Sequence, residues 1–592
     1  MGMNLTKCVL GGLMMGLLTI PSGVAAAADA PTADTVRKTQ EIVAAAKQDM
    51  DRNADAHSVH PTDPISRLEQ TLPAKTYSLK LNTRDYQVKT LQVGAQSVAV
   101  RVYADRVYVA KPADADYEKM TIYVPEAYFQ GQSINGYTAK TAPIFLPNGV
   151  GGYMPGTSVV PGEDERHGGA NAAFTALSKG YVVAAPAIRG RSLQAADGSY
   201  TGKAPALIVD YKAAVRYLRY NQERLPAGDT EKIISDGTSA GGALSALLGA
   251  TGNSSDYAAY LKELGAADAR DDIFASAVYC PITNLEHADM AYEWVFNGVH
   301  DYHQRQMPGG GMAKPADAQG TMMPSSIKVG DKTIPLGPGP VILPQNSPAG
   351  QALAGGRPAN APAETDAAAQ LSEAQIAASA DLKGQFPAYV NSLGLRDSQG
   401  RLLTLDADGN GTFREYIASL YRTSAQSALD AGQDLSGLDW LTVENGQVTG
   451  VDLAKYAVYA TRLKAVPAFD AFDLSSGEND EFGTTMLSAQ HFTDYAAQNS
   501  TVSAAMADEA IIRLLNPMNY IGDSAVRTAP YWRIRHGAVD RDTSLAVPAM
   551  LALKLADAGC QVDFSSPWNR GHDGDYDLDA LFDWTDHLCK AK

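Results

Sequence analysis

The feature that most constrains the fold is an alternation of short apolar runs with helical segments, which begins near residue 97. Residues 181–186 are apolar throughout and residues 275–280 are apolar apart from Ser276, as is typical of strands buried on both faces of a parallel sheet. The pattern therefore predicts an α/β fold, with a mostly parallel sheet covered by helices on both sides. Further strands are expected at residues 76–81, 97–109, 120–124, 142–146, 233–235, 530–537 and 562–565, and helices at residues 32–53, 172–178, 204–220, 242–248, 544–558 and 578–589.

This alternation stops after Pro281 and resumes only near residue 530. The stretch between is helical and loop-rich, with Pro, Gly and Ala clusters such as residues 336–344. One long interruption predicts a lid or cap inserted between two halves of a single catalytic domain. We expect a signal peptide at residues 1–28, an N-terminal extension at 29–95, the first part of the catalytic domain at 96–283, the lid insertion at 284–516 and the second part at 517–592.

The first residues have the pattern of an export signal. Lys7 precedes an apolar run at residues 8–20, and small residues at 25–28 offer a cleavage site. The run is shorter than the about 20 residues that cross a bilayer, so the mature chain is expected to be secreted or periplasmic. Its net charge of −17 repels phosphate backbones and anionic lipid, so neither nucleic acid nor membrane is expected as a partner.

Export would permit disulfide bonds, and three cysteines remain after the signal peptide, at positions 280, 560 and 589. Cys560 precedes a predicted strand and Cys589 ends the last predicted helix, so we favour a Cys560–Cys589 bridge. Three buried free thiols are the alternative. No C-x-x-C spacing indicates a zinc or redox motif.

Gly237-Thr-Ser-Ala-Gly241 matches G-x-S-x-G between a predicted strand and a predicted helix. In that context the motif predicts a nucleophile elbow, a strained turn that presents the Ser239 hydroxyl above the sheet. A glycine-rich helix start is the alternative interpretation. Because a serine is a weak nucleophile, it needs a general base held by an acid.

In this fold the acid and then the histidine follow the serine along the chain. His572 lies in a loop between the last predicted strand and the last helix, where the base is expected. Asp540 and Asp542 follow the preceding strand, and we choose Asp540 because it comes first; an N-terminal acid of the next helix is the alternative for either. His536 lies within a buried-type strand and is expected in the core.

An oxyanion hole needs two backbone N–H donors. Ala240 follows the nucleophile and supplies one. The glycine-rich loop at residues 148–152 is expected to supply the other, from Gly151 or Gly152, although an ordinary turn is also compatible with it.

A loop in the predicted insertion resembles the start of an EF-hand, with Asp406, Asp408 and Asn410 at positions 1, 3 and 5, and Thr412 at position 7. Position 12 is Ile417, so the usual bidentate glutamate is missing. A structural calcium ion is one interpretation, and a turn rich in Asp and Asn is the other.

Several motifs together resemble the bacterial tannases, the tannin acyl hydrolases, an α/β-hydrolase family. The likeness extends from about Val107 to the end of the chain. The motifs are Pro147-Asn-Gly-Val-Gly-Gly-Tyr153, Gly237-Thr-Ser-Ala-Gly-Gly242, Leu463-Lys-Ala-Val-Pro-Ala-Phe-Asp470, Ser476-Gly-Glu-Asn479, Trp532-Arg-Ile-Arg-His-Gly-Ala-Val-Asp-Arg-Asp542 and Gly571-His-Asp573.

The resemblance implies a serine esterase that hydrolyses galloyl ester bonds of tannins, with depside bonds as an additional substrate, to release gallic acid. It implies a Ser239–Asp540–His572 triad, in agreement with the choice made from the residues. It further implies that Lys464, Glu478 and Asp542 bind the three galloyl hydroxyls. Without the resemblance, Lys464 and Glu478 would be interpreted as a surface ion pair, and Asp542 as a helix cap. Small galloyl esters are the expected partners, and no cofactor is expected in catalysis.

Three other functions stay open at this stage. A feruloyl or chlorogenate-type esterase could use the same scaffold, as could a serine peptidase. A secreted binding protein that kept the fold without activity is a further alternative, although a complete set of candidate catalytic residues argues against it.

Overall fold

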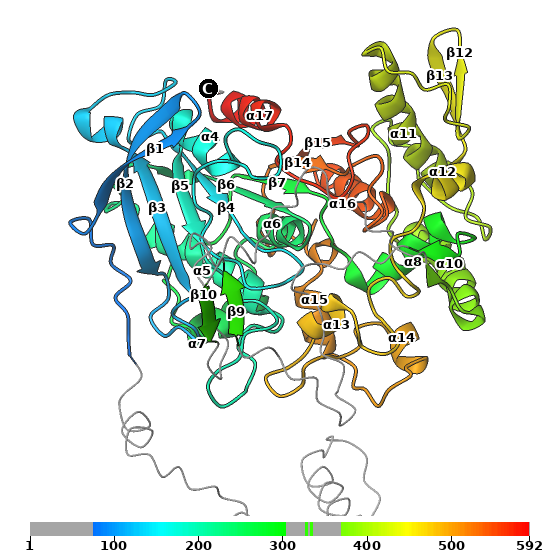
Figure 1. Cartoon of the computed structure of the whole chain (residues 1–592), viewed down its shortest axis with the longest axis horizontal. Coiled ribbons are helices and arrows are strands. Elements are labelled where there is room, and N and C mark those ends of the chain that lie inside the picture. The colour runs from blue at the N-terminus through cyan, green and yellow to red at the C-terminus, as the bar shows by residue number, and fades with distance from the viewer. Residues whose placement is uncertain (1–74, 303–325, 330–331, 336–368, 591–592) are drawn as a thin grey trace, which may run out of the picture. The chain divides into compact units, whose positions relative to one another are not determined.

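The chain divides into two units, residues 1–74 and 75–592, and the computed structural model describes residues 75–302, 326–329, 332–335 and 369–590. The predicted signal peptide and the helix at 32–53 lie outside the described residues. A nine-stranded sheet, ordered β1-β2-β3-β5-β4-β6-β7-β14-β15, forms the centre of the second unit (Figure 1). Its strands are β1 (Gln87–Val93), β2 (Gln96–Val107), β3 (Lys119–Pro125), β4 (Pro143–Pro147), β5 (Val182–Pro186), β6 (Asp229–Thr238), β7 (Ala275–Tyr279), β14 (Tyr531–Arg535) and β15 (Gln561–Ser565).

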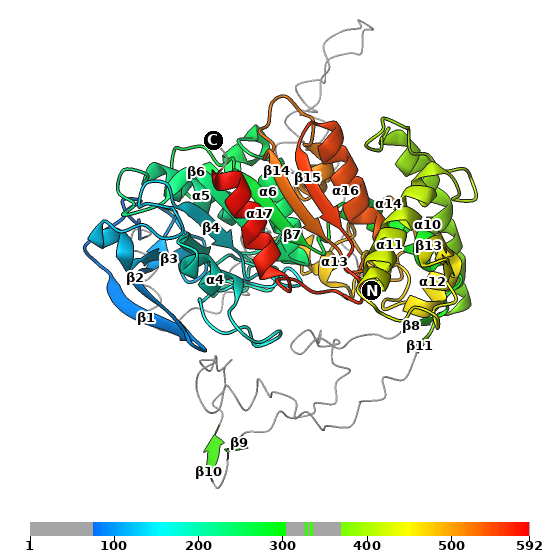
Figure 2. The same cartoon turned by 90° about the horizontal axis from the view of Figure 1, so that it is seen from above.

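The strands from β5 to β15 in this order run parallel, whereas β1, β2 and β3 add an antiparallel edge. Strands β4, β5 and β7 are buried along their whole length, because helices cover both faces of the parallel part. Figures 1 and 2 show α4 and α17 on one face and α5, α6 and α16 on the other, which confirms the predicted α/β-hydrolase fold. These helices are α4 (Ala172–Ser178), α5 (Ala206–Tyr220), α6 (Ala240–Ala250), α16 (Ala546–Asp557) and α17 (Leu578–Lys590), and η1 (Glu126–Gln130), η2 (Ser255–Tyr257) and α7 (Ala258–Glu263) lie in loops.

Two sequence predictions differ at the N-terminal edge. Residues 76–81 form no strand; the N–H of Leu81 instead donates to the side chain of Asn221 at 2.9 Å. Strand β1, which was not predicted, pairs with β2 and is exposed along most of its length, so it lacks the apolar signal of a buried strand. The boundary expected at residue 95 therefore falls within the β1–β2 hairpin.

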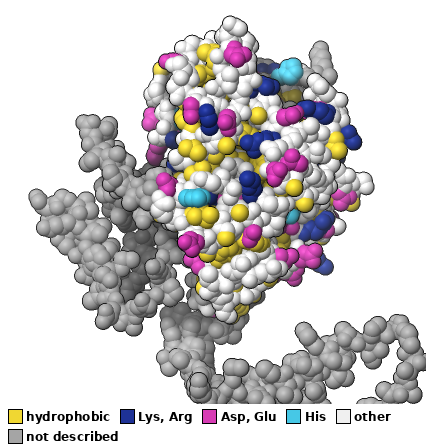
Figure 3. Space-filling view, turned by 90° about the vertical axis from the view of Figure 1, so that its right-hand side faces the viewer, with side chains coloured by type: hydrophobic (Ala, Val, Ile, Leu, Met, Phe, Trp, Pro, Cys, Tyr) yellow, Lys and Arg dark blue, Asp and Glu magenta, His cyan; other side chains and the backbone are white. Residues whose placement is uncertain are grey.

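Between β7 and β14, none of the described residues adds a strand to the large sheet. This segment corresponds to the predicted insertion, and Figure 3 views the side of the molecule where its helices α10, α11 and α12 lie. Acidic and basic side chains are intermixed on that face, without a single basic patch. The elements are α8 (Leu285–Phe296), β8 (Asp301–Tyr302), β9 (Ser326–Val329), β10 (Lys332–Pro335), β11 (Ala369–Gln370), α10 (Glu373–Ser392), α11 (Thr412–Asp430), β12 (Leu441–Glu444), β13 (Gln447–Val451), α12 (Leu453–Ala460), α13 (Gly477–Glu481), α14 (Asp494–Gln498), α15 (Glu509–Leu514) and η3 (Pro517–Asn519).

No helix in the described part of the chain is long and apolar enough to span a membrane.

The predicted Cys560–Cys589 disulfide is wrong, since both cysteines are free. Helix α17 crosses the sheet, so its last turn lies near β6, where Lys232 donates to the Cys589 carbonyl at 2.7 Å. Cys560 immediately precedes β15, three strands away from β6. At about 4.8 Å per strand, this separation exceeds what a disulfide can bridge.

Within the insertion, a buried ion pair fastens the segment around Arg462 to helix α8. Glu293 of α8 and Arg462 have fully buried side chains, and their charged atoms lie 2.5 Å apart. Arg462 also donates to the carbonyl of Lys464, and Ser379 of α10 donates to Glu293. The pair thus fixes the segment that carries Lys464 against two helices.

We expect Arg462→Met to lower the free energy of unfolding by about 3–5 kcal/mol, because it leaves the Glu293 carboxylate buried without its partner. The double variant Glu293→Gln/Arg462→Met should recover part of this loss, since it contains no unpaired charge. Urea unfolding followed by tryptophan fluorescence measures both values. A loss below about 1 kcal/mol for Arg462→Met, as for an exposed pair, would contradict the expectation.

Candidate functional site

Ser239 lies at a sharp turn between β6 and α6. Its backbone has φ 63° and ψ −125°, a strained conformation for a residue with a side chain. The turn is held by a hydrogen bond from the Ser239 N–H to the Tyr279 carbonyl, at 2.9 Å. A Cβ atom at Gly237 would lie 2.3 Å from the Gly241 carbonyl oxygen, so only glycine fits at that position of the motif.

The structure brings together the three residues that the sequence proposed as nucleophile, base and acid. Nε2 of His572 lies 2.8 Å from Ser239 Oγ, and Nδ1 lies 2.9 Å from Asp540 Oδ2. The Asp540 side chain is fully buried, whereas that of His572 is 19% exposed. Such a chain can accept the hydroxyl proton on the imidazole and hold the resulting cation against a carboxylate.

The electrostatic environment favours opposite charges on Asp540 and His572. Burial alone would raise the pKa of Asp540, but His572 and His536 outweigh it and hold that pKa well below its usual range. Burial alone would lower the pKa of His572, but Asp540 and Asp542 raise it well above its usual value. When His572 is neutral, the ionised Asp540 keeps the ring proton on Nδ1, and Nε2 can then accept from Ser239.

The glycine-rich loop lies directly against the turn at Ser239. Asn148 donates to the Gly241 carbonyl at 3.0 Å, and a Cβ atom at Gly241 would lie 2.6 Å from the Val150 carbonyl oxygen. Gly151 and Gly152 follow Val150 and are not buried. Ala240 is the first residue of α6, where N–H groups have no acceptor within the helix. Both predicted sources of backbone N–H donors therefore lie at the Ser239 turn.

The three residues that the family resemblance assigned to substrate also lie close together. Lys464 Nζ is 2.9 Å from Asp542 Oδ1, and the two side chains are 21% and 22% exposed. Although burial opposes it, the charges of Asp542 and Glu478 raise the pKa of Lys464. Burial raises the pKa of Glu478, and Lys464 counteracts this rise. The group offers one ammonium and two carboxylates beside His572.

Tyr292, which the sequence analysis did not select, joins this group to the Asp540 turn. Its hydroxyl accepts from the N–H groups of Leu463 and Lys464 at 3.1 and 3.3 Å and donates to the Arg541 carbonyl at 2.9 Å. Its helical position gave no signal, because the contact joins segments far apart in the chain.

Arg191 is a second residue that the sequence analysis did not assign to the site. Its Nε donates to the Gly152 carbonyl at 2.8 Å, and its guanidinium pairs with Asp480. Asp480 belongs to α13, the helix that also carries Glu478. Arg191 thereby connects the glycine-rich loop to the helix that carries Glu478. Arg191 follows the predicted strand at residues 181–186, and this position was the only feature of the sequence that could have indicated a role in the site.

The calcium-like loop is closed by its own hydrogen bonds. Asp406 Oδ1 accepts from the N–H groups of Asp408 and Asn410 at 3.0 and 2.9 Å, and the Thr412 hydroxyl donates to the Leu402 carbonyl. Glu415 lies 3.2 Å from Arg401. These contacts form an Asp-initiated turn, and calcium binding at this loop stays a prediction.

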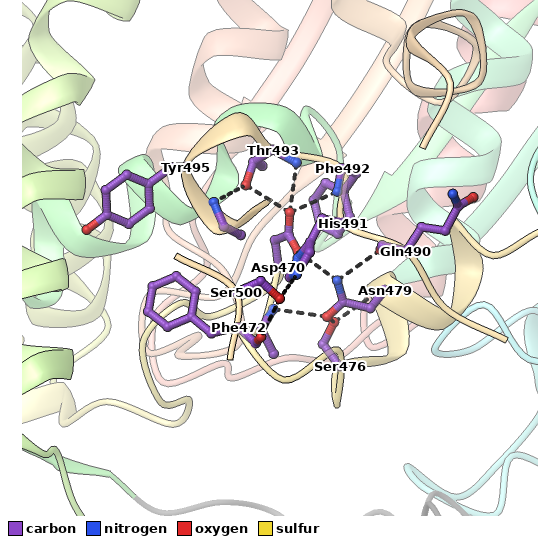
Figure 4. Close-up of polar contacts among 12 residues, drawn as sticks. Asp470, Phe472, Ser476, Asn479, Gln490, His491, Phe492, Thr493, Tyr495 and Ser500 are labelled. Atoms are coloured by element: carbon purple, nitrogen blue, oxygen red, sulfur yellow. Dashed lines mark hydrogen bonds and ion pairs between the residues drawn. The ribbon is translucent and has the colours of Figure 1, made fainter. Parts of the chain in front are cut away.

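A second serine–histidine–aspartate chain occurs in the insertion (Figure 4). Asp470 Oδ1 lies 2.7 Å from His491 Nδ1, and His491 Nε2 lies 2.9 Å from Ser500 Oγ. The sequence around Ser500 has no elbow motif, and Ser500 Oγ also lies 2.9 Å from the Val502 carbonyl. Asp470 additionally accepts from Asn479 of α13 at 2.6 Å. This chain therefore orders the segment around α13 and lacks the surroundings of a nucleophile.

Another histidine braces the loop next to His572. His167 places Nδ1 2.8 Å from Asp164 and Nε2 2.8 Å from Asp573. Only a doubly protonated ring donates to both carboxylates. Burial lowers the pKa of His167, but the two carboxylates outweigh burial and raise it above the usual value.

Comparison with known proteins places these features in a family context. The family model BD-FAE matches residues 153–324, and no curated protein sequence matches the chain. A tannase from Fusobacterium nucleatum is 46% identical, with a TM-score of 0.75, over 87% of this chain and 100% of that one. A tannase from Lactobacillus plantarum is 43% identical over the same shares, with a TM-score of 0.74. A tannin acyl hydrolase in complex with ethyl gallate is 41% identical over 86% and 99%, with a TM-score of 0.72.

We expect the His167 brace to make stability depend on pH. A histidine pKa that is raised on folding stabilises the fold fully below about 6.5, its unfolded value, and this contribution is lost as pH rises through the folded value. The melting temperature of the wild type should therefore exceed that of His167→Gln most at pH 6, and the gap should narrow above neutral pH. Calorimetry across this range measures the gap; a gap independent of pH would count against the brace.

Proposed function

The chain belongs to the tannase family and is a carboxylic ester hydrolase, and from this premise we propose that it releases gallic acid from galloyl esters of tannins through a Ser239–His572–Asp540 triad. The unbroken hydrogen-bonded chain from Ser239 Oγ to Asp540 is the observation that supports the triad most directly.

In the proposed mechanism, Ser239 Oγ attacks the galloyl carbonyl carbon while its proton passes to Nε2 of His572. Asp540 holds Nδ1 and stabilises the imidazolium, in keeping with the direction in which each pKa is shifted. The alcohol leaves with the proton from His572, and an acyl-enzyme remains. Water then attacks the acyl-enzyme with the same base.

The developing oxyanion would bond to the N–H of Ala240 and to an N–H of Gly151 or Gly152. The contact of this glycine-rich loop with Gly241 supports this assignment, since Gly241 directly follows Ala240. Two such donors stabilise negative charge in the transition state more than in the ester.

For recognition, we infer that Lys464, Glu478 and Asp542 bond to the three adjacent galloyl hydroxyls. Two carboxylates can accept from phenol groups and one ammonium can donate to a phenol oxygen. A pocket that leaves these charges unpaired when hydroxyls are missing would reject such analogues. The complex of a relative with ethyl gallate supports a small galloyl ester as the substrate class.

Export of the mature chain also remains part of the proposal. It rests on the apolar run and small residues within positions 1–28.

Ser239→Ala should lower hydrolysis of methyl gallate by several orders of magnitude, because the nucleophile is lost. The matched control is Ser500→Ala, which removes the serine of the second histidine–aspartate chain and should keep at least about half of the wild-type rate. Gallate release is measured by liquid chromatography, and a fluorophosphonate probe should label wild type and Ser500→Ala only. Near wild-type turnover by Ser239→Ala would remove this serine from the mechanism.

Glu478→Gln should lower kcat/KM for methyl gallate by about 10–100-fold, the effect of one hydrogen bond to a charged group. The same change should alter hydrolysis of methyl benzoate by less than about threefold, because that ester has no ring hydroxyls. Glu415→Gln, at an exposed ion pair of the insertion, is the control. An equal loss on both esters, or a wild-type preference for methyl ferulate, would contradict galloyl recognition.

A further inference from the structure

A cysteine and a histidine lie beside Asp540. Cys280, His536 and Asp540 each offer one ligand atom, and these three atoms lie within 4.8 Å of one another. All three residues are buried. The mechanism above uses only Asp540, so the thiol and the second imidazole have no assigned role.

The sheet itself sets this arrangement. Tyr279 of β7 pairs with Arg535 of β14, so the next residues, Cys280 and His536, leave the sheet side by side. The Cys280 N–H donates to the Arg535 carbonyl at 2.7 Å, which extends the pairing beyond the strands. Asp540 then reaches the same place from the turn after β14.

One atom of the cluster lacks a partner. Nδ1 of His536 is buried and has no hydrogen-bond partner among the described residues. It lies 3.6 Å from Asp540 Oδ2, too far for a hydrogen bond. A buried nitrogen without a partner is costly, and a bound cation is one way to satisfy it.

Ligand chemistry and charge both suit a thiophilic divalent cation. Sulfur, imidazole nitrogen and carboxylate oxygen are the ligands that Zn²⁺ takes, at about 2.0–2.3 Å. A thiolate, a carboxylate and a neutral imidazole together carry two negative charges, so the buried complex would be neutral. Closing to tetrahedral spacing needs movements of about 1 Å.

We propose that Cys280, His536 and Asp540 form an inhibitory site for a thiophilic divalent cation such as Zn²⁺ or Cd²⁺. On binding, the S–H bond of Cys280 breaks, the metal–sulfur bond forms and the proton passes to solvent. The metal also takes the Asp540 carboxylate from His572, which leaves the imidazole without its partner. The inhibitory consequence rests on the proposed triad, whereas metal binding does not.

The route to the site predicts slow inhibition. Cys280 Sγ lies 3.3 Å from the Asp573 carbonyl, beneath the backbone that carries His572. Cys280 is fully buried, whereas the His572 side chain is partly exposed, and we infer that the loop carrying His572 lies between the thiol and solvent. Entry of a cation requires the loop to move, and inhibition should therefore develop with time.

The first test is inhibition of methyl gallate hydrolysis by Zn²⁺ after preincubation. The wild type should lose activity with time and regain it with EDTA. Half inhibition of Cys280→Ser should require a Zn²⁺ concentration at least about tenfold higher than that of the wild type. The rate of each variant is expressed relative to its own rate without metal. Cys560→Ser and Cys589→Ser, which alter the other free thiols of the described chain, should match the wild type. Equal inhibition of the wild type and Cys280→Ser would overturn the proposal.

The second test measures binding without activity. In a background with Cys8, Cys560 and Cys589 replaced by serine, Cd²⁺ should produce thiolate-to-metal charge-transfer absorption that saturates at one equivalent. His536→Gln in this background should weaken binding by about tenfold or more, and Cys280→Ser should abolish the absorption. Ser239→Ala should keep it, so the metal site can stand even if the proposed esterase activity fails. Absence of the absorption in the background protein would refute the site.

Discussion

The structure depends on one constraint of a parallel sheet: strands that run in the same direction end at the same edge. The whole insertion separates β6 from β14 and β15 in sequence, yet Ser239, Asp540 and His572 follow the ends of these strands and meet within hydrogen-bond distance. The strain at Ser239 is tolerated because the strand before it and the helix after it are buried. Neither local sequence nor any single loop could produce this convergence.

Charge is distributed around this edge in a consistent way. Asp540 is buried beside two imidazoles, and its carboxylate is stabilised by them rather than by water. Asp542, two residues later, pairs with Lys464 and also acts on His572. The turn that presents the proposed acid Asp540 therefore also presents Asp542, one of the three residues proposed to bind the substrate. In the proposed mechanism, two neighbouring carboxylates therefore couple the electrostatics of substrate recognition to those of proton transfer.

The sequence indicated the sheet and the residues at its edge because both depend on local patterns. Runs such as β5 are apolar throughout, and Ser239 and His572 follow predicted strands. Contacts between distant segments carried no such signal, so Arg191 and Tyr292 were missed. The disulfide prediction failed for the same reason: spacing along the chain does not reveal that α17 crosses the sheet before Cys589. The exposed strand β1 was missed because it has no buried face to mark it.

The bond network of Tyr292 has a consequence for the exchange of parts between relatives. Its hydroxyl bonds to the backbone of Leu463, Lys464 and Arg541, and it therefore joins the insertion to the Asp540 turn, as do the Lys464–Asp542 and Tyr456–Ala538 contacts. A chimaera that transplants only the insertion would place Tyr292 against the 540–542 turn of another protein. This mismatch would misplace Asp540 as well as the Lys464 ammonium. To change substrate specificity by exchanging segments between relatives, α8, the 463–464 segment and the 540–542 turn should therefore be exchanged together.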